Sequence, residues 1–482
     1  MPDSRPITHP LRIAVIGTGY VGLVSAACLA HIGHHVTAVD SDAGKVHALQ
    51  RGAIPIYEAG LQPLVAAQAR EGRLLFSHAT ADAVHGADLV FIAVGTPADA
   101  QGGADLRALR RAVEDIAACI VHPLTVVIKS TVPVGTSDAA RAALRGALAR
   151  RGIDWEVPVL SNPEFLREGT ATEDFLNPAR ILVGARTAHE AAVLRLAYEP
   201  LVRQGVPLIV MSPRSAELSK YAANTMLAAR ISFINEIADI AQATGADIEE
   251  VREGLGTDPR IGPAFLKAGI GYGGSCFPKD VSSLRHAARS LGVPTDLLAA
   301  VERVNERHRH WPVARLAQAY GGREALRGLR VAVWGLAFKP GTDDLREAAS
   351  LVVLQELVEA GAAVAAYDPV AMRNAVDLVP AHPRLEWRAS AADALEGAHA
   401  LLLLTEWREF IDFPPERVAE QLKDALVIDG RNALSAPRWE AAGLQVHQVG
   451  RPVGDTHPSL PVMPWRDAGD PRARPAAAAG TS

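Results

Sequence analysis

Apolar residues in this chain gather into short runs that alternate with longer helical stretches. Residues 11–16 (Leu-Arg-Ile-Ala-Val-Ile) have the pattern of a buried strand, and after a glycine-rich turn the apolar run of residues 23–32 predicts a helix. A second strand is predicted over residues 35–39 (His-Val-Thr-Ala-Val). Strands and helices that alternate in this way predict an α/β fold with a parallel sheet.

The same order of segments returns in the second half of the chain. Residues 12–17 recur as 330–335, residues 35–40 as 363–368, and residues 81–87 as 392–398. Three landmarks in the same order predict two doubly wound domains of related build. The second copy has Leu-Ala-Phe-Lys at 336–339 where the first has its glycine turn, so we expect the second domain to bind a different group.

A long helix is predicted between the two domains. Ser212 is a suitable N-cap with Pro213 at the first helical position, and the pattern continues to about residue 243, just before Gly245. Such a helix would extend about 45 Å, which is enough to join two domains. We therefore expect an N-terminal domain at 1–211, a central helical region at 212–325, a C-terminal domain at 326–462 and a disordered tail at 463–482.

One face of the predicted helix carries Lys220 and Asn224, which are four residues apart, with Glu217 and Tyr221 alongside. An exposed pair at this spacing is usually only a solvated surface. Because the helix is otherwise poor in charge and rich in alanine, we favour a functional lysine on a buried face.

The turn after the first strand has the pattern of a dinucleotide-binding Rossmann fingerprint. Gly17 permits a tight turn, Gly19 allows the backbone to approach a pyrophosphate, and Gly22 allows close packing of helix on strand. The second strand ends in Asp40, which is suitably placed to bind both hydroxyls of an adenosine ribose and would repel a 2′-phosphate. We therefore expect NAD rather than NADP; a glycine turn of another α/β protein is the alternative.

A cysteine lies in the glycine-rich segment 271–280 (Gly-Tyr-Gly-Gly-Ser-Cys-Phe-Pro-Lys-Asp). Cys276 is thus presented on a loop rather than inside an apolar element, where a packing cysteine would lie. The nearby Lys279 could hold the thiol partly as thiolate, which is the nucleophilic form. On this segment alone, a catalytic and a structural cysteine are equally good interpretations.

Polar side chains follow two further predicted strands of the first domain, where open α/β sheets place their ligands. Ser130 and Thr131 lie in residues 126–136, and Glu164 and Glu168 lie in residues 159–169. The carboxylates could act as general bases or orient water, or they could be helix caps or surface ion pairs.

Composition excludes several classes of protein. The chain has 482 residues, with 49 Lys and Arg against 54 Asp and Glu, a balance that does not favour nucleic acid or an acidic membrane surface as a partner. The three cysteines, Cys28, Cys119 and Cys276, have no metal-site spacing, so no metal is expected and a reducing cytoplasm is the natural compartment. Residues 13–30 lack charged side chains, but a strand and a helix account for them better than a membrane span does.

Taken together, the segments resemble the family of nucleotide-sugar 6-dehydrogenases, which includes the UDP-glucose and GDP-mannose enzymes. The resemblance covers about residues 11–453 and rests on GTGYVG, VGTP at 94–97, STVPVGT, NPEFLREG, the Lys220 and Asn224 helix, Arg260-Ile-Gly262, GYGGSCFPKD and residues 338–346. It implies an N-terminal NAD domain, a helical dimerisation core and a C-terminal domain for the nucleotide diphosphate. It also implies that a sugar 6-hydroxyl becomes a carboxylate at the expense of two NAD and one water.

The resemblance implies roles for individual residues. The implied catalytic residues are Cys276 as the nucleophile, Lys220 for oxyanions, Asp280 and Thr131 for the water, Glu164 as a base and Asn224 at the oxyanion. The implied NAD contacts are Gly17, Gly19, Tyr20, Val21, Gly22, Asp40, Lys45, Thr96, Thr131, Glu168, Lys279 and Arg346. The implied substrate contacts are Glu164, Phe165, Leu166, Arg167, Glu168, Lys220, Asn224, Arg260 from the partner subunit, Lys267, Tyr272, Gly273, Phe338, Lys339 and Arg431.

The oxidation of an alcohol through to an acid explains why such a site would need a cysteine. Oxidation of an alcohol to an aldehyde needs no thiol, whereas oxidation through to an acid needs a covalent holder for the aldehyde between the two steps.

Ser275 and Phe277 around the cysteine resemble the UDP-glucose branch of the family, and the GDP-mannose and N-acetylamino-sugar branches are the alternatives. One departure lies at Pro178-Ala179-Arg180, where the family usually has an aspartate before the arginine. In a different class, the chain could be a catalytically silent regulator that binds NAD and a nucleotide sugar.

Overall fold

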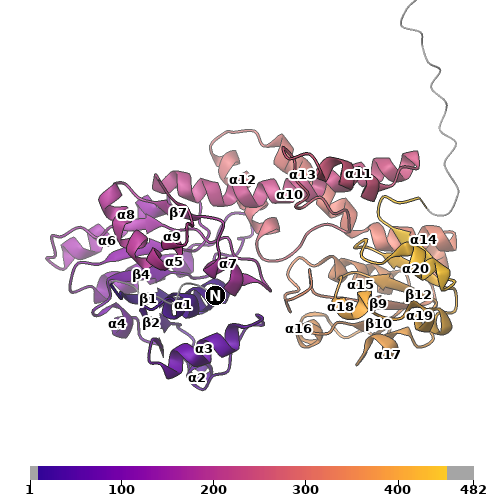
Figure 1. The fold of residues 1–482 in the computed structure, drawn as a ribbon, viewed down its shortest axis with the longest axis horizontal. Coiled ribbons are helices and arrows are strands. Elements are labelled where there is room, and N and C mark those ends of the chain that lie inside the picture. The colour runs from indigo at the N-terminus through magenta and orange to yellow at the C-terminus, as the bar shows by residue number, and fades with distance from the viewer. Residues whose placement is uncertain (1–8, 453–482) are drawn as a thin grey trace, which may run out of the picture.

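The computed structural model describes residues 9–452, which form two α/β lobes joined by a bridge of helices (Figure 1). The predicted disordered tail, residues 463–482, lies outside the described residues. No helix in the described range is both long enough and apolar enough to cross a membrane.

The first lobe is built on an eight-stranded sheet of order β3-β2-β1-β4-β5-β6-β7-β8. All neighbouring strands are parallel except β6 and β7. The strands are β1 (Arg12–Ile16), β2 (His35–Val39), β3 (Leu74–Ser77), β4 (Leu89–Ile92), β5 (Thr125–Ile128), β6 (Val159–Ser161), β7 (Ile181–Gly184) and β8 (Leu208–Met211). The helices are α1 (Tyr20–His31), α2 (Ala43–Gln50), α3 (Leu61–Arg70), α4 (Thr80–Val84), α5 (Arg107–Cys119), α6 (Thr136–Arg150), α7 (Ala171–Leu176), α8 (Ala188–Ala197) and α9 (Glu199–Arg203).

The two faces of this sheet bury separate apolar cores, because side chains alternate along each strand. Ile13 and Val15 of β1 pack with α1, α3 and α8 on one face. Ala14 and Ile16 pack with α4, α5 and α6 on the other face. Residues 13–30, which contain no charged side chain, are thus a buried strand, a glycine turn and a buried helix, as predicted.

The second lobe repeats the plan of the first. Its six parallel strands have the order β11-β10-β9-β12-β13-β14, which matches the order β3-β2-β1-β4-β5-β6 in the first sheet and confirms the internal repeat. The strands are β9 (Arg330–Trp334), β10 (Ala363–Tyr367), β11 (Leu385–Trp387), β12 (Ala400–Leu403), β13 (Leu426–Asp429) and β14 (Gln445–Gln448). The helices are α15 (Ala349–Glu359), α16 (Met372–Leu378), α17 (Ala391–Leu395), α18 (Arg408–Ile411), α19 (Pro415–Gln421) and α20 (Ala436–Ala441).

The bridge is dominated by α10 (Pro213–Thr244), whose limits agree with the prediction. The Ser212 side chain accepts a hydrogen bond from Ser215 N, and Gly245 ends the helix at φ 78°, a left-handed conformation that favours glycine. At 32 residues the helix is about 48 Å long, and it packs against α12 and α13. The other bridge elements are α11 (Ile248–Gly256), α12 (Phe277–Ser290), α13 (Asp296–Arg309), α14 (Trp311–Tyr320) and the 3-10 turn η1 (Arg323–Leu326).

The turns after β1 and β9 show how the two lobes have diverged. After β1, the chain enters α1 within four residues, whereas after β9 it makes a long loop and α15 begins only at Ala349. In that loop, Leu336 N and Ala337 N donate to Asp368 at 2.7 and 3.1 Å, and Trp407 Nε1 donates to the same oxygen at 2.9 Å. Asp368 is 0% exposed, so the carboxylate that corresponds in the second lobe to Asp40 of the first is closed to solvent.

Candidate active site

A cavity of about 930 Å³ lies where the first lobe, the start of α12 and the loop after β9 meet. The predicted site residues that line it are Gly19, Tyr20, Val21, Thr96, Thr131, Glu164, Leu166, Glu168, Cys276, Lys279 and Arg346. The glycine turn and the cysteine, which are more than 250 residues apart in the chain, therefore share one cavity.

The glycine turn has the geometry that a dinucleotide requires. A Cβ on Gly17, which has φ 99°, would lie 2.7 Å from Ala93 O, and one on Gly22 would lie 1.9 Å from Gly17 O. A Cβ on Gly19 would meet nothing within 4 Å, and this residue lines the cavity. The turn thus packs tightly on the protein at Gly17 and Gly22 and opens to a ligand at Gly19, as the fingerprint predicted.

Asp40 stands at the end of β2, beside this turn. One of its oxygens accepts hydrogen bonds from Thr18 N at 3.0 Å and from Lys45 Nζ at 3.0 Å. Burial raises the pKa of this carboxyl, but these and other hydrogen bonds outweigh that effect and hold the pKa below its ordinary value. Asp40 is therefore a carboxylate at neutral pH.

Cys276 is the N-cap residue of α12, and its Sγ lies 3.5 Å from Ser275 Oγ. Two glycines before it press against the second lobe rather than facing open space. A Cβ on Gly273 would lie 2.3 Å from Glu347 O, and one on Gly274 would lie 2.7 Å from the ring of Phe338. The glycines therefore lock the cysteine loop to the loop after β9.

Burial is the main influence on the Cys276 thiol and raises its pKa, and the Glu164 carboxylate acts in the same direction. The lysine that opposes this rise is Lys220. Lys279 instead pairs with Asp280, with its Nζ 2.5 Å from Oδ1. The suggestion that Lys279 holds the thiolate was therefore wrong, because its charge is already matched by the neighbouring carboxylate.

Lys220 and Asn224 of α10 are both buried, as the alanine-rich pattern indicated. Lys220 Nζ lies 3.0 Å from Glu164 Oε1 and 5.1 Å from the centre of the Phe165 ring. Asn224 Nδ2 donates to Asp280 Oδ2 at 2.6 Å. Two buried polar pairs therefore connect α10 to the segment after β6 and to α12.

Glu217, on the same helix, does not belong to this group. Its carboxylate accepts hydrogen bonds from Gly135 N at 2.6 Å and from Ser137 N at 2.8 Å, at the start of α6. It satisfies backbone donors at a helix N-terminus and has a structural role.

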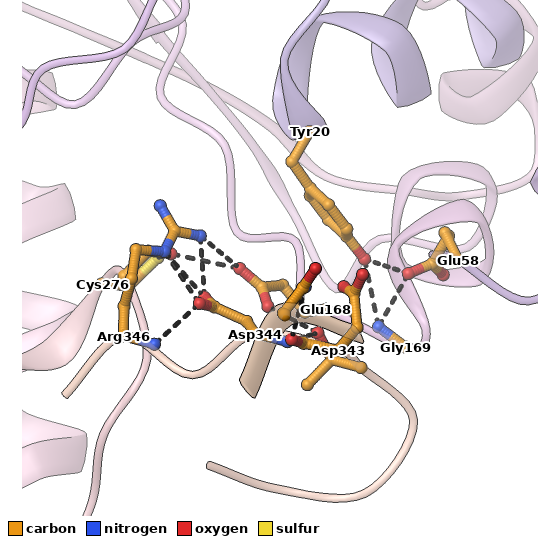
Figure 2. Close-up of polar contacts among 11 residues, drawn as sticks. Tyr20, Glu58, Glu168, Gly169, Cys276, Asp343, Asp344 and Arg346 are labelled. Carbon is orange, nitrogen blue, oxygen red and sulfur yellow. Dashed lines mark hydrogen bonds and ion pairs between the residues drawn. The ribbon is translucent and has the colours of Figure 1, made fainter. Parts of the chain in front are cut away.

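Glu168 joins three parts of the chain (Figure 2). Its carboxylate accepts from Ser275 Oγ at 3.1 Å and from Thr342 Oγ1 at 3.0 Å, and it lies 3.5 Å from an Arg346 nitrogen. Burial and the nearby Asp344 raise its pKa, against the effect of Arg346. This carboxylate therefore ties the first lobe both to the cysteine loop and to the loop after β9.

Sequence reasoning missed Glu58, which Figure 2 shows beside Tyr20 and Gly169. Its carboxylate accepts from the Tyr20 hydroxyl, from Gly169 N at 2.7 Å and from Ala171 N at 2.8 Å. Burial is the main reason that the pKa of Tyr20 is raised, with Glu58 adding to it. Glu58 lies in an irregular segment after α2 and has no local pattern that would have singled it out.

Several predicted substrate residues do not line this cavity. They are Phe165, Arg167, Lys220, Asn224, Arg260, Lys267, Tyr272, Gly273, Phe338, Lys339 and Arg431, together with the catalytic candidate Asp280. Arg260 and Lys267 are exposed. The Arg431 guanidinium donates to the carbonyls of Leu404, Gly271 and Phe338 at 2.7, 3.1 and 2.8 Å. Arg431 therefore fastens the cysteine loop to the second lobe.

Ala179 departs from the expected motif, and the arginine after it, Arg180, stacks on the Phe165 ring, with its guanidinium carbon 3.7 Å from the ring centre. The arginine thus packs against the residue that also borders Lys220, and an aspartate before it is not needed for that contact.

Comparisons with known proteins match three spans of the chain to one family. Residues 11–202 match the NAD binding domain of the UDP-glucose/GDP-mannose dehydrogenase family, residues 214–307 its central domain and residues 332–436 its UDP binding domain. A UDP-glucose 6-dehydrogenase of Pseudomonas aeruginosa is 44% identical over 92% of this chain and 98% of its own length. A UDP-glucose 6-dehydrogenase of Rhizobium meliloti is 42% identical over 92% of this chain and 100% of its own.

Among solved structures, a UDP-glucose dehydrogenase from the archaeon Pyrobaculum islandicum aligns with a TM-score of 0.83 and 37% identity. The alignment covers 92% of this chain and 98% of that one. The glycine turn lies in the first of the three matched spans, the Lys220 helix and the cysteine loop lie in the second, and this chain belongs to the UDP-glucose/GDP-mannose dehydrogenase family.

Proposed function

We propose that this protein oxidises the 6-hydroxyl of UDP-glucose to a carboxylate, with NAD as the electron acceptor. The observation that carries the proposal is the single cavity lined by both the glycine turn and Cys276. A dinucleotide site beside a thiol is the combination that oxidation beyond the aldehyde requires. The relatives named above as UDP-glucose 6-dehydrogenases support the substrate.

The first lobe would hold NAD. The open position at Gly19 would receive the pyrophosphate, and Asp40, with Lys45 beside it, would bind the adenosine ribose. Thr96, whose hydroxyl donates to Thr131 O at 2.7 Å, would also contact NAD, as would Glu168 and Arg346. When bound, NAD supplies the acceptor for a hydride in each of the two oxidations.

Cys276 would hold the aldehyde between these oxidations. Its sulfur adds to the aldehyde carbon and the thiol proton moves to the former carbonyl oxygen, which gives a thiohemiacetal. Loss of a hydride and a proton from that adduct leaves a thioester. The buried ammonium of Lys220 would stabilise negative charge on the oxygen at both stages, because a fixed cation in a site shielded from water acts strongly on developing charge.

Water would then cleave the thioester, releasing the acid and restoring the thiol. Thr131 and Asp280 would hold this water, and Glu164, which lines the cavity, would accept its proton. Asn224 fixes one oxygen of Asp280, and Leu166 N donates to Glu164 at 2.5 Å, so both carboxylates have defined orientations.

The substrate diphosphate and sugar would bind between the bridge and the second lobe. The residues proposed to contact them are Phe165, Leu166, Arg167, Lys267, Tyr272, Gly273, Phe338, Lys339 and Arg431. For Lys339, burial lowers the pKa, with Glu168 opposing. A diphosphate would offer this ammonium the anionic partner that favours its charged form.

We further propose a homodimer formed through α10. Met226, Phe233 and Ile240 lie seven residues apart on this helix and are 64, 52 and 54% exposed, so they form an apolar stripe. Arg260, 86% exposed in its side chain, would then reach the sugar of the substrate that is bound to the partner subunit.

The domain limits that we propose are 1–211, 212–325 and 326–462. The three free cysteines favour the cytoplasm as the compartment.

The test is NADH formation from a panel of nucleotide sugars. UDP-glucose should give the highest kcat/KM, followed at a distance by GDP-mannose and UDP-N-acetylamino sugars. Faster turnover of GDP-mannose would move the chain to that branch of the family with the same chemistry. Binding of NAD and UDP-glucose without any NADH would indicate a silent regulator instead.

A further inference from the structure

A second lysine is buried beside the cavity that contains Cys276. Lys129 directly follows β5 and is 4% exposed. Its Nζ donates to Asn162 Oδ1 at 3.1 Å and to the Tyr198 hydroxyl at 3.4 Å. The rings of Phe175 and Tyr198 lie 5.7 and 6.0 Å from the ammonium.

The groups that hold this ammonium are themselves fixed. The Tyr198 hydroxyl donates to Asn162 Oδ1 at 2.7 Å, and Asn162 Nδ2 donates to Leu182 O at 2.8 Å. Both acceptors of Lys129 are neutral, whereas Lys220 has the carboxylate of Glu164 at 3.0 Å. A buried charge held only by neutral groups is costly for the fold, which makes a functional reason for it worth testing.

The position of Lys129 suggests that reason. Lys129, Thr131 and Glu164 line the same cavity as Cys276. Glu164 favours the charged form of both Lys129 and Lys220, and the two ammonium groups repel each other. Lys129 and Lys220 therefore share the buried carboxylate of Glu164. The buried carboxylate of Asp280 also acts on Lys220 but is paired with Lys279, so this wall of the cavity has an excess of positive charge.

We propose that Lys129 is a positioning residue whose fixed ammonium shares Glu164 with Lys220 and keeps the Thr131 and Glu164 wall of the cavity positively charged. Negative charge that develops on the reacting oxygen is then stabilised by more than Lys220 alone. This role rests on the proposed function.

The role has a pH signature. Burial lowers the pKa of Lys129 to about 8, Glu164 opposes this and Lys220 adds to it. The titratable and charged groups around the lysine are Cys28 on α1, Glu164 after β6, Asp174 on α7, Arg180 before β7, Tyr198 between α8 and α9, and Lys220 on α10. The ammonium is present below its pKa and is lost above it, so its contribution to kcat should fall as pH rises through about 8.

The experiment compares kcat for UDP-glucose and NAD from pH 6 to 9.5 in wild type, Lys129→Arg and Asn162→Asp. A ratio of wild-type to variant kcat cancels the ionisation of groups that the proteins share. Because a guanidinium stays charged, the ratio to Lys129→Arg should be constant below about pH 7 and fall roughly tenfold above pH 8. Asn162→Asp gives the lysine an anionic partner, so that variant should lose activity only at higher pH than wild type.

A third variant, Lys129→Met, separates chemistry from binding. At pH 7 its kcat should fall roughly tenfold or more, with KM within about threefold of wild type. Lys423→Met, at an exposed lysine in the second lobe, is the matched control and should leave kcat unchanged. If Lys129→Arg does not fold, as judged by circular dichroism, Asn162→Asp carries the test alone.

A wild-type to Lys129→Arg ratio that does not change with pH, or an Asn162→Asp profile that coincides with wild type, would overturn this role. A wild type that forms no NADH from UDP-glucose would refute the proposed function and this role with it. An active wild type with pH-independent ratios would overturn the role of Lys129 alone.

Discussion

At Cys276, burial and charge act in opposite directions. Burial and Glu164 raise the pKa of the thiol, while Lys220 lowers it. The thiol of the free protein is therefore protonated at neutral pH, and in the proposed mechanism it would pass its proton to a base or to the carbonyl oxygen as the sulfur adds. The sequence placed the cysteine on a glycine-rich loop, but the degree of burial depends on contacts with the second lobe, which no local pattern reports.

The pH dependence of alkylation by iodoacetamide should show how these opposing effects set the pKa of the Cys276 thiol. In a Cys119→Ser background, where the remaining Cys28 is 0% exposed, the rate of Cys276 alkylation should still be rising above pH 9, since only the thiolate reacts. Adding Lys220→Met removes the lysine charge that lowers the pKa, so the midpoint should move to higher pH, whereas Lys423→Met should not move it. A lower midpoint in Lys220→Met would show that this lysine does not act on the thiol.

Asp40 controls the choice of cofactor in our account. Wild type should prefer NAD over NADP strongly, and Asp40→Ala should reduce that preference, because the carboxylate would repel a 2′-phosphate. Asp42→Ala, which removes the N-cap of α2 but leaves Asp40 in place, is the control and should keep the preference. The kcat/KM values for the two cofactors measure this directly. Equal use of NADP by wild type would contradict the role given to Asp40.

At the scale of elements, the local patterns were reliable and the long-range contacts were not visible. Periodicity, the Ser212 cap and Gly245 predicted α10, and the repeated segments predicted two sheets of the same order. Glu217 was grouped with Lys220 because they share a helix, yet it caps α6, some eighty residues away in sequence. The hydrogen bonds of Glu58, of Lys129 and of the Arg431 guanidinium are likewise made with residues that are distant in the sequence.

Glu217 should stabilise the junction of α10 and α6. Glu217→Ala removes an acceptor for Gly135 N, Ser137 N and the Ser137 hydroxyl, so about 1.5–3 kcal/mol of stability should be lost. Thermal unfolding should show a Tm lowered by several degrees. Glu236→Ala, at an exposed glutamate of the same helix, is the control and should leave Tm within about a degree of wild type. Equal Tm values for the two variants would refute the capping role.

At the scale of the whole molecule, the two lobes have kept one plan and changed one turn. The first lobe keeps a short glycine turn into α1, while the second has sealed Asp368 and extended the corresponding loop toward the cavity. Residues 342–344 and 346–347 of that loop line the cavity beside the cysteine. The turn that no longer resembles a phosphate site thus helps to form the site shared by both lobes.

The apolar stripe on α10 should be an interface between two copies of the chain. Light scattering after gel filtration should give at least twice the chain mass of 51.0 kDa for wild type, and Phe233→Asp should give a monomer with unchanged circular dichroism. Val376→Asp, which places the same charge at an exposed apolar residue of α16, should remain associated. A monomeric wild type, or an associated Phe233→Asp variant, would contradict the proposed interface.

The most direct test of the account is the yield of NADH from a limiting amount of UDP-glucose with excess NAD. Because Cys276 would hold the aldehyde until it is oxidised again, two NADH should form per sugar, and no free aldehyde should be trapped by a hydrazine reagent. Cys276→Ser should bind both ligands in calorimetry but fail to produce the acid. One NADH per sugar with aldehyde in solution, or normal acid production by Cys276→Ser, would contradict the covalent mechanism.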